Sequence, residues 1–325
     1  MSDLVRVGAV DCGTNSIRLL VADIDRHAGA LTDVLRRMEV VRLGYGVDRT
    51  GRIDPEAMAR TLATAREYAA QCSALGVTAV RFVATSASRD ASNAAEFVAG
   101  VAEAFSAFGT VPEVISGEEE ASLSFRGATG DLVAAGIEGP YLVVDLGGGS
   151  TELVRGTTDV EASRSMDIGC VRMTERHLHS DPPTLDEIAD AAVDIERAVT
   201  RALDTVSPDG VRTLVGLAGS VTTVTAHALS LPGYDPHRIH LAVTAPEVMR
   251  TAARRLLGMT RAQRSALPFM HPGRVDVIGA GALVWDIVIR EVQRRSGLGS
   301  GLRVVTSEHD ILDGIALGVA EAAKP

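Results

Sequence analysis

The segment VVDLGGGSTEL, residues 143–153, places an acid, three adjacent glycines, a serine and a second acid within a strand-like run. Glycine at this density weakens a strand, so we expect the backbone itself to contact a ligand. Successive N–H groups of such a turn form a positive concavity that can bind phosphate. Asp145 and Glu152 would repel that phosphate unless a hard cation lay between them, which indicates Mg²⁺ (or Mn²⁺). The alternative is that both acids only accept hydrogen bonds within the turn.

A second segment, VDCGTNSIRLLV at residues 10–21, matches VDLGGGSTELV. Asp11 aligns with Asp145 and Ser16 with Ser150, so the pattern predicts one hairpin unit used twice. Asp11 precedes its turn as Asp145 does and is a third candidate metal ligand. Two such turns facing each other across a cleft would hold a phosphate chain from both sides; a chance resemblance of two glycine hairpins is the alternative.

A third glycine turn lies in VGLAGSVTT, residues 215–223, after an apolar strand and before a helix. A helix that begins at Gly219 and Ser220 would point its N-terminal N–H groups at an anion. A strand, a glycine turn and a helix also follow one another in many proteins that bind no ligand there. This turn therefore indicates an anion site only together with the two hairpins.

The rest of the chain alternates strands and helices, which predicts an α/β protein. Asp54 and Pro55 begin a helix that ends near Gly76, Ser116 caps a helix that opens with Glu118, Glu119 and Glu120, and VTAVRFVATSASRD is a strand that runs into a polar loop. RHLHSDPP, with His177, His179 and Asp181, is an ordered loop rather than a metal site, and Arg274 and Asp276 cap or pair at a helix start.

Composition excludes several classes of function. The net charge of −10 disfavours nonspecific nucleic-acid binding, and Lys324 is the only lysine, so a Walker-type phosphate loop is impossible. The abundant arginines suit bidentate phosphate binding, although a codon bias that replaces lysine by arginine would give the same composition. The chain has no apolar run of membrane-spanning length, its start lacks signal-peptide features, and its three cysteines are scattered. We therefore expect a cytoplasmic protein without membrane association or disulfides.

Seven segments in this order resemble the exopolyphosphatase and guanosine pentaphosphate phosphohydrolase (Ppx/GppA) family: VDCGTNSIRLLV, ATSASRDASN, ISGEEEASLSF, VVDLGGGSTELV, MDIGCVRMTE, LAGSVTTV and HPGRVDVIGAGA. The resemblance covers nearly the whole chain. It implies two ribonuclease-H-like domains of the actin, Hsp70 and sugar-kinase superfamily, with an active site in the cleft between them. The expected boundaries are 1–126 plus a closing helix at 310–325 for the N-terminal domain and 127–309 for the C-terminal domain.

The resemblance also implies roles for individual residues. Glu120 falls on the glutamate that orients and deprotonates the attacking water, with the adjacent Glu119 as the alternative base. Arg89 matches a phosphate-contacting arginine, and Asp145 and Glu152 look like the metal-binding acids; Asp11, placed by the hairpin repeat, is the third expected metal ligand. The expected phosphate-binding residues, from the hairpin turns, the third glycine turn and Arg89, are Asn15, Ser16, Arg89, Gly147, Gly148, Gly149, Ser150, Gly219 and Ser220.

The function implied is release of terminal orthophosphate from inorganic polyphosphate, with hydrolysis of guanosine pentaphosphate as the close alternative. A sugar or acetate-type kinase and an actin-like nucleotide switch are more distant alternatives on the same fold. Longer family members carry an HD-type C-terminal extension that this sequence lacks, from which we expect a preference for shorter chains. A homodimer is expected from the resemblance alone.

Overall fold

The computed structural model describes residues 4–322, which form two compact units. Unit 1 comprises residues 1–127 and 311–325, and unit 2 comprises residues 128–310. These units are defined by contacts within the chain. The boundaries predicted from the sequence concern independently folding domains, so they stay a prediction.

Unit 1 is built on a five-stranded sheet in the order β3-β2-β1-β4-β5. The first three strands are antiparallel neighbours, whereas β4 and β5 run parallel to β1. The strands are β1 (Leu4–Cys12), β2 (Ser16–Asp25), β3 (Ala30–Val40), β4 (Ala79–Ala84) and β5 (Glu113–Val114). The helices are α1 (Val47–Thr50), α2 (Pro55–Ala74), α3 (Ser86–Asp90), α4 (Ala94–Ala104), the first part of α5 (Gly117–Ala134) and α13 (Ile311–Ala322).

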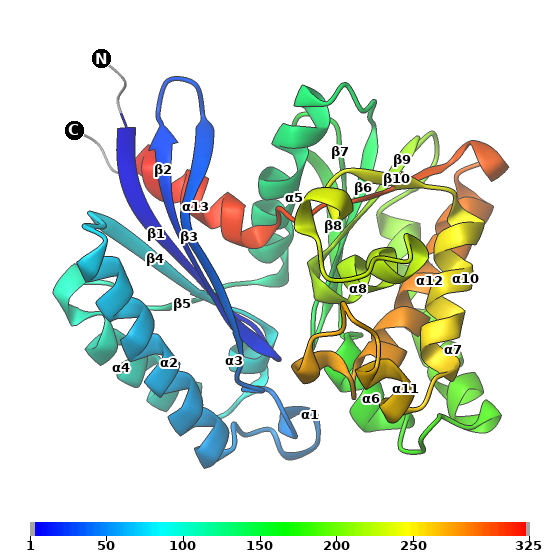
Figure 1. Ribbon diagram of the computed structural model, residues 1–325, viewed down its shortest axis with the longest axis horizontal. Helices are drawn as coiled ribbons and strands as arrows, with labels where there is room; N and C mark the ends of the chain where they lie inside the picture. The colour runs from blue at the N-terminus through cyan, green and yellow to red at the C-terminus, as the bar shows by residue number, and fades with distance from the viewer. Residues whose placement is uncertain (1–3, 323–325) are drawn as a thin grey trace. The chain divides into compact units, whose positions relative to one another are not determined.

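Alternation along β1 and β2 divides the apolar side chains of unit 1 between two faces. Val10, Ile17 and Leu19 pack with α2 and α4, whereas Ala9 and Leu20 pack with α13 and the start of α5 (Figure 1). The second face is closely packed, because a Cβ atom on Gly314 would lie 2.0 Å from the Leu123 carbonyl oxygen. Both faces of the sheet are therefore covered, and chemistry is confined to the strand ends.

Unit 2 repeats this arrangement in the order β8-β7-β6-β9-β11, with β10 added at the edge beside β11. Again the strands β6, β7 and β8 are antiparallel neighbours, whereas β9 and β11 run parallel to β6. The strands are β6 (Tyr141–Leu146), β7 (Thr151–Gly156), β8 (Val160–Met166), β9 (Thr213–Leu217), β10 (Ala242–Thr244) and β11 (Arg303–Thr306). The helices are α6 (Cys170–His177), α7 (Leu185–Thr205), α8 (Ala218–Ala228), α9 (Pro236–Ile239), α10 (Pro246–Gly258), α11 (Arg261–Ser265) and α12 (Ile278–Arg295).

The core of unit 2 is centred on α12, which contributes the fully buried Trp285. Gly216 in β9 permits this packing, because a Cβ atom there would lie 2.7 Å from the indole ring. Val144 and Leu153 face the same core from β6 and β7. Since side chains alternate along a strand, Asp145 and Glu152 project from the opposite face of the sheet.

The shared strand order confirms the prediction of two ribonuclease-H-like α/β units and of a duplicated hairpin. Caps at Asp54 and Ser116 are also confirmed: each side chain accepts a hydrogen bond from the first turn of its helix. The predicted polar loop after β4 is wrong. Ser86–Asp90 forms the short helix α3, because Ser86 and Ser88 are buried and the backbone N–H of Arg89 bonds to Thr85.

The three cysteines, Cys12, Cys72 and Cys170, are free thiols, and all three are buried. Burial raises the pKa of the Cys12 thiol well above its ordinary value, with a further contribution from the nearby Asp11 charge. These thiols therefore serve packing. Within residues 4–322, no helix has the length and apolarity needed to cross a membrane.

Candidate functional site

The β1–β2 and β6–β7 turns close in the same way. The N–H of Gly13 donates to the Ser16 carbonyl at 3.0 Å, and the N–H of Gly147 donates to the Ser150 carbonyl at 3.0 Å. The equivalent positions found in the sequence are therefore equivalent in hydrogen bonding too.

The carbonyl oxygens of each turn are held by a later segment of the same unit. In unit 1, Arg42 and Gly44 donate their N–H groups to the carbonyls of Asn15 and Thr14, both at 2.8 Å. In unit 2, the N-terminus of α6 performs this role: Cys170 donates to Gly147 at 3.0 Å and Val171 to Gly148 at 2.9 Å. The carbonyl oxygens of each turn thus accept hydrogen bonds from one later segment, which we call the brace of that turn. The N–H groups of the turn therefore point away from its brace.

Those N–H groups are available for a ligand. Among residues 4–322, no carbonyl accepts a hydrogen bond from the backbone N–H of Thr14 or Asn15 in the first turn, nor from that of Gly148 or Gly149 in the second. Adjacent amides in a turn form an anion-binding concavity. Both predicted phosphate turns have this chemistry within their own units.

The charged residues that flank the turns differ. Asp11 lies directly opposite Arg18 in the β1–β2 register, and Arg18 forms an ion pair with Asp11 Oδ2 at 2.6 Å. Asp145 lies directly opposite Glu152 in the β6–β7 register. Both carboxylates of this second pair are buried, at 6% and 1% exposure, and Ser165 donates a hydrogen bond to Glu152 at 2.7 Å. Two buried acids in register on neighbouring strands bring carboxylate oxygens close together, and these are the ligands that hard cations prefer.

This donor set fits the expected metal. Carboxylate oxygens are the ligands that Mg²⁺ prefers, and two carboxylates with water and phosphate oxygens are a common way to bind it. Asp145 and Glu152 therefore suit a divalent cation by their donor atoms and by their position opposite each other. Asp11 differs from them in that Arg18 lies opposite it and forms an ion pair with it.

Arg89 and Glu120 come together in unit 1 from segments that follow adjacent parallel strands. Arg89 lies on α3 after β4, and Glu120 lies on α5 after β5. The Arg89 Nη1 atom donates to Glu120 Oε2 at 2.9 Å and to the Ile115 carbonyl at 2.9 Å. Both bonds use the same nitrogen of Arg89, and a guanidinium has five N–H donors. The other guanidinium N–H groups of Arg89 can therefore donate to phosphate oxygens.

Glu119 and Glu120 have different surroundings. Glu120 is 8% exposed and paired with Arg89, whereas Glu119 is exposed and paired with Arg81 at 2.6 Å. Glu120 is held in one orientation at the end of the sheet where Asp11 and the first turn also lie, since Asp11 pairs with Val83 near the end of β4. This difference supports Glu120 over Glu119, although the assignment of the base stays a prediction.

The third glycine turn lies at the same edge of unit 2 as the second hairpin turn. Asp145 and Leu217 are register partners in the parallel pair β6–β9, and α8 begins immediately after Leu217. The Arg274 guanidinium lies against this helix start, because a Cβ atom on Gly219 would be 2.3 Å from it. The start of α8 therefore carries a positive side chain that the sequence suggested only as a cap or an ion-pair partner.

Three features of the site were not found from the sequence. Arg18 was not identified as a site residue from VDCGTNSIRLLV. The signal that could have identified it is its alignment with Glu152, where the repeat has the opposite charge. The brace from α6 and the place of Arg274 depend on contacts between segments distant in sequence. The prediction of a loop for RHLHSDPP is correct only in part, because Arg176 and His177 form the end of α6, where His177 contacts Asp194 at 3.1 Å.

Comparison with known proteins assigns the chain to a family. Residues 20–316 match the Ppx/GppA phosphatase family. Exopolyphosphatase 2 of Mycobacterium tuberculosis (strain CDC 1551 / Oshkosh) is 52% identical over 321 residues, which cover 98% of this chain and 99% of that protein.

Solved structures agree with this similarity. A crystal structure of an exopolyphosphatase-like protein has a TM-score of 0.92 and 43% identity, covering 97% of this chain and 98% of its own. A crystal structure of the Aquifex aeolicus member of the Ppx/GppA family has a TM-score of 0.80 and 29% identity, covering 99% of this chain and 100% of its own.

Proposed function

The chain belongs to the Ppx/GppA phosphatase family, and we propose that it is an exopolyphosphatase that releases terminal orthophosphate from inorganic polyphosphate. The exopolyphosphatase 2 relative, similar over nearly its whole length, supports this activity. The structural observation that carries the proposal is the pair of buried, opposed acids, Asp145 and Glu152, beside a turn with available N–H groups. This combination suits a polyanion bound with a divalent cation.

In the proposed reaction, a water oxygen attacks the terminal phosphorus and the bond from that phosphorus to the bridging oxygen breaks. Glu120 accepts the proton of the attacking water, and Arg89 orients the Glu120 carboxylate and donates to phosphate oxygens. The turn amides of Gly148 and Gly149 stabilise the charge that develops on the phosphoryl oxygens. Bound Mg²⁺ would neutralise phosphate charge at Asp145 and Glu152.

Glu120→Gln tests the assignment of the base, and Glu119→Gln is its matched control. We expect E120Q to lower kcat by about 10²–10⁴, because a positioned general base contributes that much. E119Q should retain nearly full activity, since Glu119 is exposed and pairs with Arg81. Comparable circular dichroism of both variants would exclude misfolding, and a slow E119Q beside an active E120Q would reverse the assignment.

A phosphate-release assay tests the substrate. It compares polyphosphates of several lengths, guanosine pentaphosphate and ATP, each with Mg²⁺, with Mn²⁺ and with a chelator. We expect polyphosphate to be hydrolysed with the highest kcat/KM and only when a divalent cation is present. Preferential hydrolysis of guanosine pentaphosphate would instead favour the alternative activity of the family.

Polyphosphate is thus the proposed substrate partner. Homodimerisation, a cytoplasmic location and a preference for short chains stay predictions. Light scattering and the length series of the same assay would test the first and the last.

A further inference from the structure

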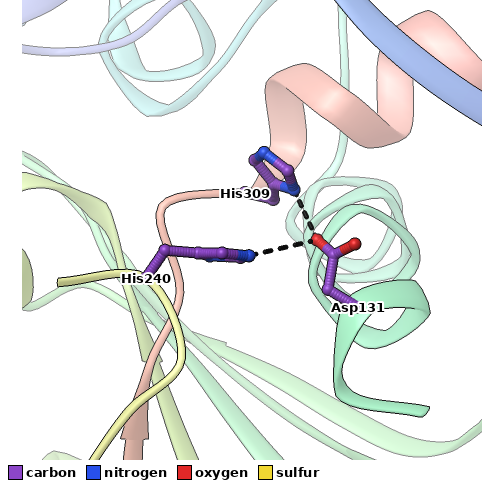
Figure 2. Close-up of side chains that lie close together, drawn as sticks. All are labelled: Asp131, His240 and His309. Atoms are coloured by element: carbon purple, nitrogen blue, oxygen red, sulfur yellow. Dashed lines mark hydrogen bonds and ion pairs between the residues drawn. The ribbon is translucent and has the colours of Figure 1, made fainter. Parts of the chain in front are cut away.

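Three side chains outside the proposed hydrolytic site converge in unit 2. Asp131 lies on α5, His240 directly follows α9, and His309 lies between β11 and α13 (Figure 2). Asp131 Oδ2 is 2.5 Å from His309 Nδ1 and 3.5 Å from His240 Nε2, and the two imidazole centroids are 4.6 Å apart. Within residues 4–322, this is the group of three histidine, cysteine or acidic residues whose ligand atoms all lie within 4.8 Å of one another.

These residues converge only because of the tertiary structure. More than a hundred positions separate Asp131 from His240, and about seventy more separate His240 from His309. Asp131 follows the start of unit 2 at Ala128, and His309 precedes its last residue, Asp310. The cluster therefore joins the two ends of the unit 2 chain.

From this geometry we propose that Asp131, His240 and His309 form a site for a divalent transition-metal ion of the Zn²⁺ class, distinct from the Mg²⁺ site of the hydrolytic reaction. Two imidazole nitrogens and one carboxylate oxygen are a common donor set of zinc sites that keep a fourth position for water. Imidazole suits Zn²⁺, Co²⁺ and Ni²⁺, whereas Mg²⁺ prefers oxygen ligands, so the histidine pair selects against Mg²⁺.

The ligand-atom distances and the side-chain exposures of the cluster are compatible with binding of a metal ion. At metal–ligand bonds of about 2.0–2.2 Å, tetrahedral ligand atoms lie roughly 3.3–3.6 Å apart. The Asp131–His240 separation already has this value, and the Asp131–His309 contact must open by about 1 Å. The side chains of His240, His309 and Asp131 are 23%, 34% and 39% exposed, so an ion can enter from solvent.

One contact must change when the ion binds. The N–H of Glu308 lies 3.3 Å from His240 Nδ1 and donates to it, so in the metal-free protein His240 carries its proton on Nε2, facing Asp131. Coordination through Nε2 transfers that proton to Nδ1 and breaks the bond from Glu308. Metal binding therefore shifts the Glu308 peptide, which gives a signal in amide NMR spectra.

Calorimetric titration of the chelator-treated, tag-free full chain with ZnCl₂ tests the proposal. We expect one ion per chain at this cluster, which excess Mg²⁺ does not displace, and a tetrahedral visible spectrum with Co²⁺. His240→Gln and His309→Gln should each weaken this binding at least about tenfold, by analogy with the cost of losing a supporting group. Asp131→Asn, nearly identical in shape, should do the same if a histidine variant fails to fold.

Two control variants separate this site from others. His177→Gln removes a histidine that has an acidic partner, Asp194, but belongs to no group of three among the described residues, and binding should be unchanged. Glu152→Gln alters the hydrolytic site and should also leave this Zn²⁺ binding unchanged. Absence of a stoichiometric site, or titrations of H240Q, H309Q and D131N that match the wild type, would overturn the proposal and leave the cluster as a hydrogen-bonded Asp–His group. All readouts are binding measurements, so they are independent of which phosphate substrate is hydrolysed.

Discussion

The β1–β2 hairpin of unit 1 and the β6–β7 hairpin of unit 2 share a closing hydrogen bond, a braced set of carbonyls and an acid at the end of the first strand. They differ at the residue opposite that acid, where unit 1 has Arg18 and unit 2 has Glu152. The first pair is a carboxylate with a guanidinium, whereas the second is two buried carboxyl groups. One backbone design thus carries an ion pair in one unit and a pair of acids suited to a divalent cation in the other.

The largest expected effect comes from the acidic pair. Asp145→Asn should lower activity at fixed Mg²⁺ on the order of 100-fold or more, because a ligand of the cation is lost. Initial rates against Mg²⁺ concentration measure this effect, and a thermal melt of the variant checks that it is folded. An unchanged Mg²⁺ response would exclude Asp145 as a ligand.

Asp11→Asn should act mainly on stability. The change leaves the guanidinium of Arg18 without its carboxylate, and loss of a partly buried charged partner costs about 1–3 kcal/mol of the free energy of unfolding. Urea unfolding measures this cost, and the double variant Asp11→Asn with Arg18→Met should recover part of it. A D11N protein of normal stability but with a weakened Mg²⁺ response would show that Asp11 is a metal ligand, as the sequence suggested.

Gly169 and Gly44, which allow the brace segments to approach the two turns, should also differ in the cost of adding a side chain. A Cβ atom on Gly169 would lie 2.4 Å from the backbone oxygen of Gly148, whereas on Gly44 it would lie 2.4 Å from the Thr14 side-chain methyl. A backbone atom held by α6 cannot move easily, so Gly169→Ala should destabilise the protein by about 1–3 kcal/mol. The atoms that a Cβ on Gly44 would meet belong to the side chains of Thr14 and, at 3.0 Å, Ala87, so Gly44→Ala should cost less than Gly169→Ala, about 1 kcal/mol. Equal unfolding midpoints for the two variants would contradict the comparison.

The smallest effect concerns how each unit begins its long helix. Asp54 caps α2, whereas α7 begins with a reciprocal Thr184–Glu187 capping box. Hydrogen bonds from the backbone of Thr184 and then from Ser180 and His179 lower the pKa of Glu187 to about 2. This stabilisation is fully present above the unfolded pKa of about 4.3 and is lost as the pH falls toward 2. The melting-temperature difference between wild type and Glu187→Gln should therefore shrink between pH 6 and pH 3.

Local sequence contained most of the fold. Helix starts at Asp54 and Ser116 depend on a side chain and a nearby N–H group, and the hairpin repeat depends on residues within one turn, so both could be predicted without distant contacts. Helix α3 was missed because its serines are held by burial rather than by local preference. The separate surroundings of Glu119 and Glu120 likewise depend on Arg81 and Arg89, which reach them from other segments.

The sequence by itself determined the α/β class, the doubled glycine hairpin and the residue types suited to binding phosphate with a cation, because these follow from strand alternation, turn chemistry and charge. Only the tertiary structure decided which partner each charge has. Arg18 beside Asp11, Arg274 against Gly219 and the Asp131–His240–His309 cluster all result from packing between segments far apart in the chain, where short-range preferences carry no information.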